Sequence, residues 1–189
     1  LNNVLKTYGE NISVLFIEPQ LTLKDELIKN TISLCNKTDY SFVAINSNKS
    51  SLLELFIPNQ SLFPNTTTIA SFDKDQIIKR LRRFHGIKKP LLNKHFFAEI
   101  VPQKTISEVA KEWNGYDGNI EICDVLVVDT EGYDDQVIYS IDNPKNLPKL
   151  ISFEYKNLTN EKFFNLKTFL ENHQFKVFKW SKADAIAIK

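Results

Sequence analysis

The chain has 189 residues, of which 42% are hydrophobic and 25% charged, and its net charge is +1. These values exclude a disordered or fibrous protein and suit a single globular domain spanning residues 1–189. The near-neutral charge argues against an obligate nucleic-acid binder. No run of 18 apolar residues is present, so we expect neither a membrane-spanning helix nor a membrane partner. The two cysteines are too few for a disulfide framework and suit the cytoplasm.

In the first part of the chain, short apolar β-type runs alternate with segments of helical spacing. Residues 1–8 resemble the last turns of a helix that stops at Gly9. A capping box of Thr105 and Glu108 marks one helix start, and Ser71 or Asp73 marks another. The pattern predicts strands at 12–17, 40–45, 52–57 and 96–101, helices at 21–35, 73–84 and 105–113, and a loop at 58–68.

After a turn at 114–119, the second part of the chain continues the same alternation and ends in a β-hairpin. We predict strands at 124–128 and 149–153, helices at 134–141 and 160–172, and hairpin strands at 175–180 and 185–188. Alternating strands and helices predict one α/β domain with a mostly parallel sheet and helices on both faces. The closing hairpin predicts an antiparallel strand at an edge of this sheet near the C-terminus.

Three of the predicted strands end in an acidic residue, namely Glu18, Asp129 and Glu154. In open α/β sheets, ligands bind beyond the carboxyl ends of the strands, so we interpret the three acids as parts of one cleft. The alternative is that each acid caps the helix that follows it. Asp134 and Asp135 are interpreted only as acids at the positive end of the next helix.

Two of these acids indicate more specific chemistry. An acid after the second strand of a Rossmann-like sheet accepts hydrogen bonds from the ribose of a nucleotide-type cofactor, and Glu18 fits this place if a first strand precedes Leu1 and is missing from the chain. Asp129 and Glu131 stand two residues apart at a strand exit. They could share a metal, or divide the roles of general base and orienting group, and Gly132 permits a tight turn.

Residues 124–138, with the sequence DVLVVDTEGYDDQVI, resemble the signature of the FkbM-type methyltransferases. Residues 16–19 and 150–154 resemble two further motifs of that family, in the same order along the chain. The resemblance implies a Rossmann-like class I methyltransferase fold that uses S-adenosylmethionine, with a hydroxyl of a sugar or secondary metabolite as acceptor. Val127 stands where the family has lysine, and the family's glycine-rich first motif would lie upstream of Leu1.

The resemblance also implies roles for individual residues. It implies that Glu18 and Pro19 contact the ribose of the cofactor and that Asn46 lies near its adenine. Asp129 is also implied as a cofactor-binding residue. It assigns methyl transfer to Asp129 and Glu131, with Asp129 as the base or orienting group. A metal that lowers the pKa of the acceptor hydroxyl is the alternative, and no residue is assigned as a metal ligand.

One dense basic cluster covers residues 79–85 and continues with Lys88, Lys89 and Lys94. We interpret it as a solvated helix with cations at its C-terminal end, although it could also bind the phosphates of a nucleic acid or a charged glycan. Two other functions therefore stay open. One is a metal-dependent glycosyltransferase that uses Asp129 and Glu131, and the other is a non-catalytic module that binds a partner through the basic helix.

Overall fold

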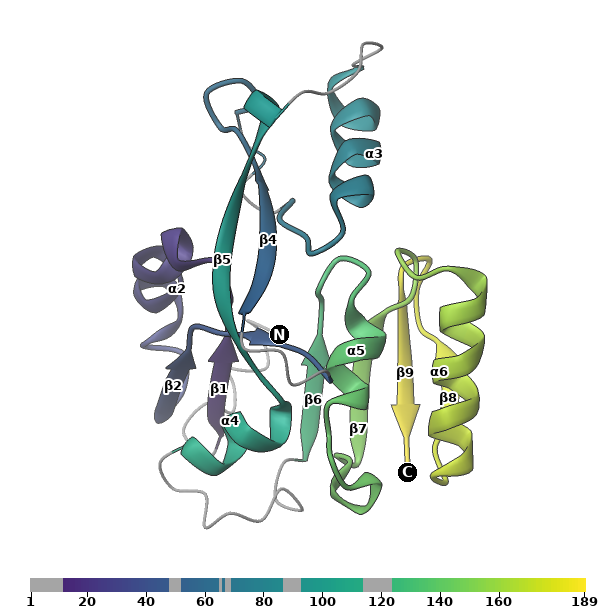
Figure 1. The fold of residues 1–189 in the computed structure, drawn as a ribbon. Helices are drawn as coiled ribbons and strands as arrows, with labels where there is room; N and C mark the ends of the chain where they lie inside the picture. Colours follow the sequence, from purple (N-terminus) through teal and green to yellow (C-terminus); the bar gives the residue numbers. More distant parts are fainter. Residues whose placement is uncertain (1–11, 48–51, 65, 67–68, 87–92, 114–123) are drawn as a thin grey trace.

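The computed structural model describes residues 12–47, 52–64, 66, 69–86, 93–113 and 124–189, which form a mixed α/β fold (Figure 1). The strands are β1 (Ser13–Ile17), β2 (Lys37–Ser41), β3 (Ala44–Ile45), β4 (Leu52–Pro58), β5 (Phe96–Lys104), β6 (Val125–Val128), β7 (Leu150–Glu154), β8 (Lys176–Lys179) and β9 (Asp184–Ile188). The helices are α2 (Lys24–Thr31), α3 (Lys74–His85), α4 (Ile106–Glu112), α5 (Asp134–Tyr139) and α6 (Asn160–Asn172). None of the helices in these ranges is long and apolar enough to cross a membrane.

Most elements lie where the sequence predicts them, with two differences near the N-terminus. The helix predicted at 21–35 is shorter, because a 3₁₀ turn at Leu21–Leu23 precedes α2 and the helix stops at Thr31. The Thr31 hydroxyl donates to the Leu27 carbonyl at 2.6 Å, in the local bonding that weakens helix interiors. The strand predicted at 40–45 is divided into β2 and β3. The predicted elements at 1–8 and 114–119 lie outside the described residues.

The strands form three hydrogen-bonded sheets rather than the one mostly parallel sheet that we predicted. The first is the parallel pair β1–β2, and the second has the order β3-β5-β4 with β4 antiparallel to β5. The third has the order β6-β7-β9-β8. Among the described strands no ladder joins these sheets. The prediction was wrong because local apolar runs indicate strands without indicating which strands pair.

The closing hairpin differs from the prediction in the position of its antiparallel strand. β9 is antiparallel to both β7 and β8 and lies between them, so β8 forms the edge and runs parallel to β7. Helix α6 leads from β7 to β8, as expected for a crossover between parallel strands. The last segment of the chain then fills the place between these two strands. The antiparallel strand is therefore internal.

The third sheet is covered on one face in the described part of the chain. Ile151 and Phe153 of β7 are buried in a core shared with α5 and α6. On the opposite face, the side chains of Val125, Val127 and Phe178 are 52–56% exposed. The prediction of helices on both faces is wrong for these residues, because a short apolar strand does not show whether its second face is covered.

Strands β4 and β5 and helix α3 project from the rest of the molecule as a lobe, at the top of Figure 1. Ile77 and Leu81 of α3 are fully buried in the lobe. Helix α3 starts as predicted, because the Asp73 side chain accepts hydrogen bonds from the amides of residues 75 and 76. It ends at Gly86, which has a left-handed φ of 61°. The lobe therefore holds α3 above the carboxyl ends of β6 and β7.

The capping box of α4 is present as predicted. The Thr105 hydroxyl accepts from the Glu108 amide at 3.1 Å, and the Glu108 carboxylate accepts from the Thr105 amide at 2.8 Å. We expect Thr105→Ala to lower the free energy of unfolding by about 1 kcal/mol in urea titrations, because alanine lacks the hydroxyl that accepts from the Glu108 amide. Thr105→Ser keeps the hydroxyl and serves as the control. Equal stability of the Ala and Ser variants would contradict the role of the cap.

Candidate active site

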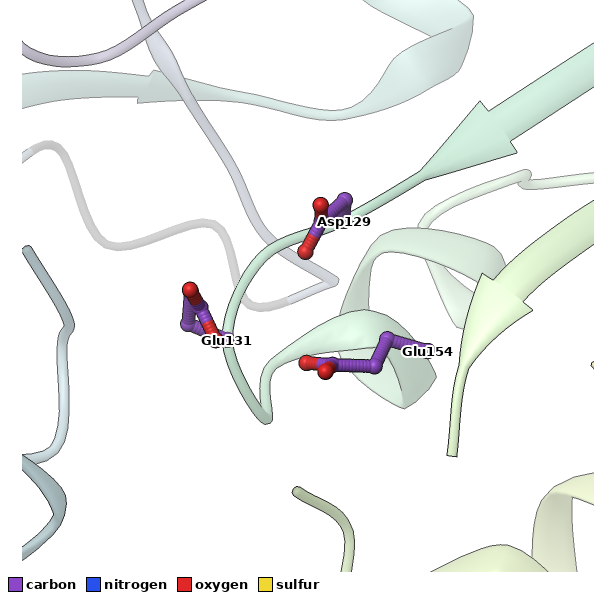
Figure 2. Close-up of side chains that lie close together, drawn as sticks. All are labelled: Asp129, Glu131 and Glu154. Atoms are coloured by element: carbon purple, nitrogen blue, oxygen red, sulfur yellow. The ribbon is translucent and has the colours of Figure 1, made fainter. Parts of the chain in front are cut away.

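Three carboxylates meet at the carboxyl ends of β6 and β7 (Figure 2). Asp129 follows β6, Glu131 lies in the next loop, and Glu154 ends β7. One oxygen from each lies within 4.8 Å of the others. Because β6 and β7 are parallel neighbours, their carboxyl ends share one edge, which brings acids 25 residues apart in the chain together. The structure thus brings together two of the three strand-end acids that the sequence singled out, and Glu131 joins them.

The loop that carries Glu131 has an unusual backbone. Glu131 has φ 57° and Gly132 has φ 100°. A Cβ atom on Gly132 would meet the Gln76 side chain and lie 3.0 Å from the Asn157 carbonyl oxygen, so the predicted tight turn requires glycine here. A left-handed conformation at a residue other than glycine costs on the order of 1 kcal/mol or more. The surrounding contacts therefore hold Glu131 in place against its backbone preference.

Asp134 supplies several of these contacts. Its side chain is fully buried and accepts from the Thr130 hydroxyl at 2.9 Å, the Gly132 amide at 3.4 Å and the Glu154 amide at 2.9 Å. It therefore ties the loop after β6 to the end of β7. From the sequence we interpreted Asp134 as an acid at the start of a helix, and Asp134 does begin α5. That interpretation did not include the hydrogen bonds that link the loop to β7. Asp135 is also buried, and it pairs with Lys162 at 3.5 Å.

The carboxylate cluster holds excess negative charge. Arg80 forms an ion pair with Glu131, and the Asn157 side-chain amide donates to Glu131 at 2.9 Å and also to Glu154. Burial and the nearby charge of Glu131 raise the pKa of Glu154 to about 7. Burial, Glu131 and Asp184 also raise the pKa of Asp129. A carboxylate with a pKa near neutrality can accept a proton from a reacting group, and a cluster of this kind can also hold a divalent cation.

Arg80 and Asn157 are site residues that the sequence analysis missed. Arg80 belongs to the basic cluster that we interpreted as a solvated helix, yet its side chain is 16% exposed and faces Glu131. The other Lys and Arg residues of this cluster in α3, Lys79, Arg82 and Arg83, are exposed as predicted. Helical spacing places Arg80 beside the apolar face of α3, but no local signal shows that its partner lies 51 residues away.

The structure places the predicted cofactor residues in two settings. Glu18 and Pro19 follow β1 and are half-buried; the Gln20 amide donates to Glu18 at 2.8 Å, and burial raises the pKa of Glu18. Asn46 is buried, its amide donating to Gln103 at 2.7 Å and its oxygen accepting from the Tyr133 hydroxyl at 3.2 Å. Because the Asn46 side-chain amide is already hydrogen-bonded within the protein, residues next to Asn46 would make any contact with an adenine.

The strand that carries Glu18 belongs to the same end of the fold as the carboxylate cluster. Leu15 and Ile17 of β1 pack against the core that contains Val128 and Phe153. In Figure 1 the arrowheads of β1 and β6 point the same way, so the carboxyl ends of these two strands face the same side of the fold. This arrangement suits a ligand that touches both groups.

Comparison of the chain with protein-family models, curated proteins and solved structures finds no match. The residues and their geometry therefore carry the functional proposal.

Proposed function

We propose that this chain is an α/β enzyme whose ligands bind beyond the carboxyl ends of β1, β6 and β7. Within that class, we propose a Rossmann-like, cytoplasmic methyltransferase that uses S-adenosylmethionine and methylates a hydroxyl of a sugar or secondary metabolite. The observation that carries the proposal is the meeting of Asp129, Glu131 and Glu154 at a strand-end edge, with the pKa of Glu154 raised to about 7. The resemblance of residues 124–138 to the methyltransferase signature gives the choice of reaction.

The proposed chemistry needs alignment of the acceptor oxygen with the methyl group and a base for the hydroxyl proton. When bound, the cofactor supplies an electrophilic methyl group. Glu18 would accept hydrogen bonds from the ribose hydroxyls, as an acid after a strand of this kind does. Glu154, with its pKa near neutrality, would take the proton, while Asp129 and Glu131 orient the hydroxyl. Arg80 and Asn157 hold Glu131 for this task.

The test is calorimetric titration with S-adenosylhomocysteine. We expect Glu18→Ala to weaken binding by about tenfold or more, because a hydrogen bond to a charged group contributes roughly 1.5–3 kcal/mol. Glu26→Ala, an exposed acid of α2, is the matched control and should bind like the wild type. A folded protein that does not bind S-adenosylhomocysteine would contradict the proposal.

A metal-dependent glycosyltransferase is the second candidate, and the carboxylate cluster is the observation that favours it. Carboxylate oxygens are the ligands that Mg²⁺ and Mn²⁺ prefer, and those of Asp129, Glu131 and Glu154 lie close enough to share one ion. Arg80 already neutralises Glu131, which reduces the charge left for a cation. Sugar-nucleotide binding that requires a divalent metal would favour this candidate over the methyltransferase.

A further inference from the structure

Helix α3 carries a run of positive charge beside the candidate site. Between Gln76 and His85 the sequence has four Lys and Arg residues and no Asp or Glu, although the net charge of the whole chain is only +1. In the structure, the second half of α3 presents exposed cations, whereas acids gather at the ends of β6 and β7. A ligand that spans both places therefore meets two opposite potentials.

One face of α3 leads from the carboxylates to the exposed cations. Residues 76, 80, 83 and 84 share this face, because residues three or four apart are neighbours on a helix. Gln76 donates to the Asn157 carbonyl at 3.3 Å and Arg80 pairs with Glu131, so this face meets the carboxylate cluster. Arg83 and Phe84 continue it by about one turn, or roughly 5 Å, away from the cluster.

Arg83 and Phe84 have the properties of a ligand contact. Arg83 is exposed, and the Phe84 side chain is 65% exposed, which is unusual for a large apolar residue. The guanidinium carbon of Arg83 lies 6.0 Å from the centre of the Phe84 ring. A guanidinium binds phosphate through two parallel hydrogen bonds, and an adjacent aromatic ring offers an apolar surface to the group that carries the phosphate.

We propose that Arg83 and Phe84 form a phosphate-binding subsite, and that the acceptor of this site is a phosphorylated molecule. Its phosphate binds Arg83 while its reacting hydroxyl lies at the carboxylate cluster. That this ligand is the methyl acceptor rests on the proposed function. The negative cluster repels the phosphate and Arg83 attracts it, so the charge pattern fixes which end of the ligand enters the site. Phe84 supports the carbon frame between the two ends.

Helix α3 provides a matched control for this subsite. Arg82 is the residue next to Arg83, it is equally charged, and it is exposed. It points roughly 160° away from Arg80 around the helix axis, on the side opposite to the site. Arg82→Gln and Arg83→Gln therefore change the net charge equally, and neither residue contributes to the buried core of the lobe. Any difference between the variants reports position rather than overall charge.

The experiment is calorimetric titration of the protein with glucose 1-phosphate, with glucose as the unphosphorylated control. We expect the wild type to bind only the phosphorylated probe, Arg83→Gln to weaken that binding by about tenfold or more, and Arg82→Gln by less than about twofold. Equal losses in both variants, or equal binding of glucose and its phosphate, would overturn the proposal. No cofactor is needed in this titration. A failure of S-adenosylhomocysteine binding would therefore contradict the proposed function separately.

Discussion

Asp134→Ala is expected to lower the free energy of unfolding by about 3 kcal/mol, because it leaves several buried donors without their acceptor. Those donors are the Thr130 hydroxyl and the amides of Gly132 and Glu154, which meet the two oxygens of the fully buried Asp134 carboxylate. The effect should appear as a lower midpoint in urea unfolding. The same cross-link fixes the loop of Glu131 relative to β7, so the variant should also disturb the carboxylate cluster.

Asp135→Ala is the matched control for this prediction. Both aspartates lie in the first turn of α5 and both are buried, so both substitutions remove a favourable interaction with the helix dipole. Asp135 pairs with Lys162, whose side chain is 42% exposed and returns to water when its partner is removed, so the loss should cost about 1 kcal/mol. If the two variants were equally destabilised, the helix dipole would explain both losses of stability. The hydrogen bonds of Asp134 to the loop and to β7 would then add nothing to the stability of the fold.

The features that the sequence predicted correctly are those with local causes. The start of α3 follows from Asp73, and the start of α4 follows from the capping box of Thr105. Each depends on residues a few positions apart, where side chain and backbone meet whatever the rest of the chain does. The same holds for Gly132, whose left-handed φ follows from the turn after β6.

The features that the sequence did not predict depend on pairing over long distances. The separation into three sheets and the place of β9 between β7 and β8 are decided by which strands meet, and apolar runs do not encode this. The site shows the same limit. The acids of the site stand at strand ends, so the sequence pattern could identify them. Arg80 and Asn157 contact Glu131 from other elements, and no local sequence pattern identifies them. Asp134 looked like a helix-start acid for the same reason.

Glu154→Gln is expected to reduce the rate of methyl transfer by about 10²–10³-fold under the proposed function, because it removes the group that accepts the hydroxyl proton. Its geometry should survive, since Gln keeps the size of the side chain and the Glu154 amide still binds Asp134. The measurement is the initial rate of methyl incorporation from S-adenosylmethionine into the acceptor. Glu161→Gln, an exposed acid of α6, is the control and should keep the wild-type rate.

The pH dependence separates a base from a merely structural carboxylate. The pKa of Glu154 is raised from 4.5 to about 7 by burial and by Glu131, so the wild-type rate should rise with pH and level off above about 7. The proton is bound more tightly in the folded protein than in the unfolded chain, so the free energy of unfolding should fall as the pH rises from about 4.5 to about 7. Glu154→Gln should remove this part of both dependences. A variant that loses the stability trend but keeps the wild-type rate profile would show that Glu154 titrates in the fold without serving as the base, and would transfer that role to Asp129.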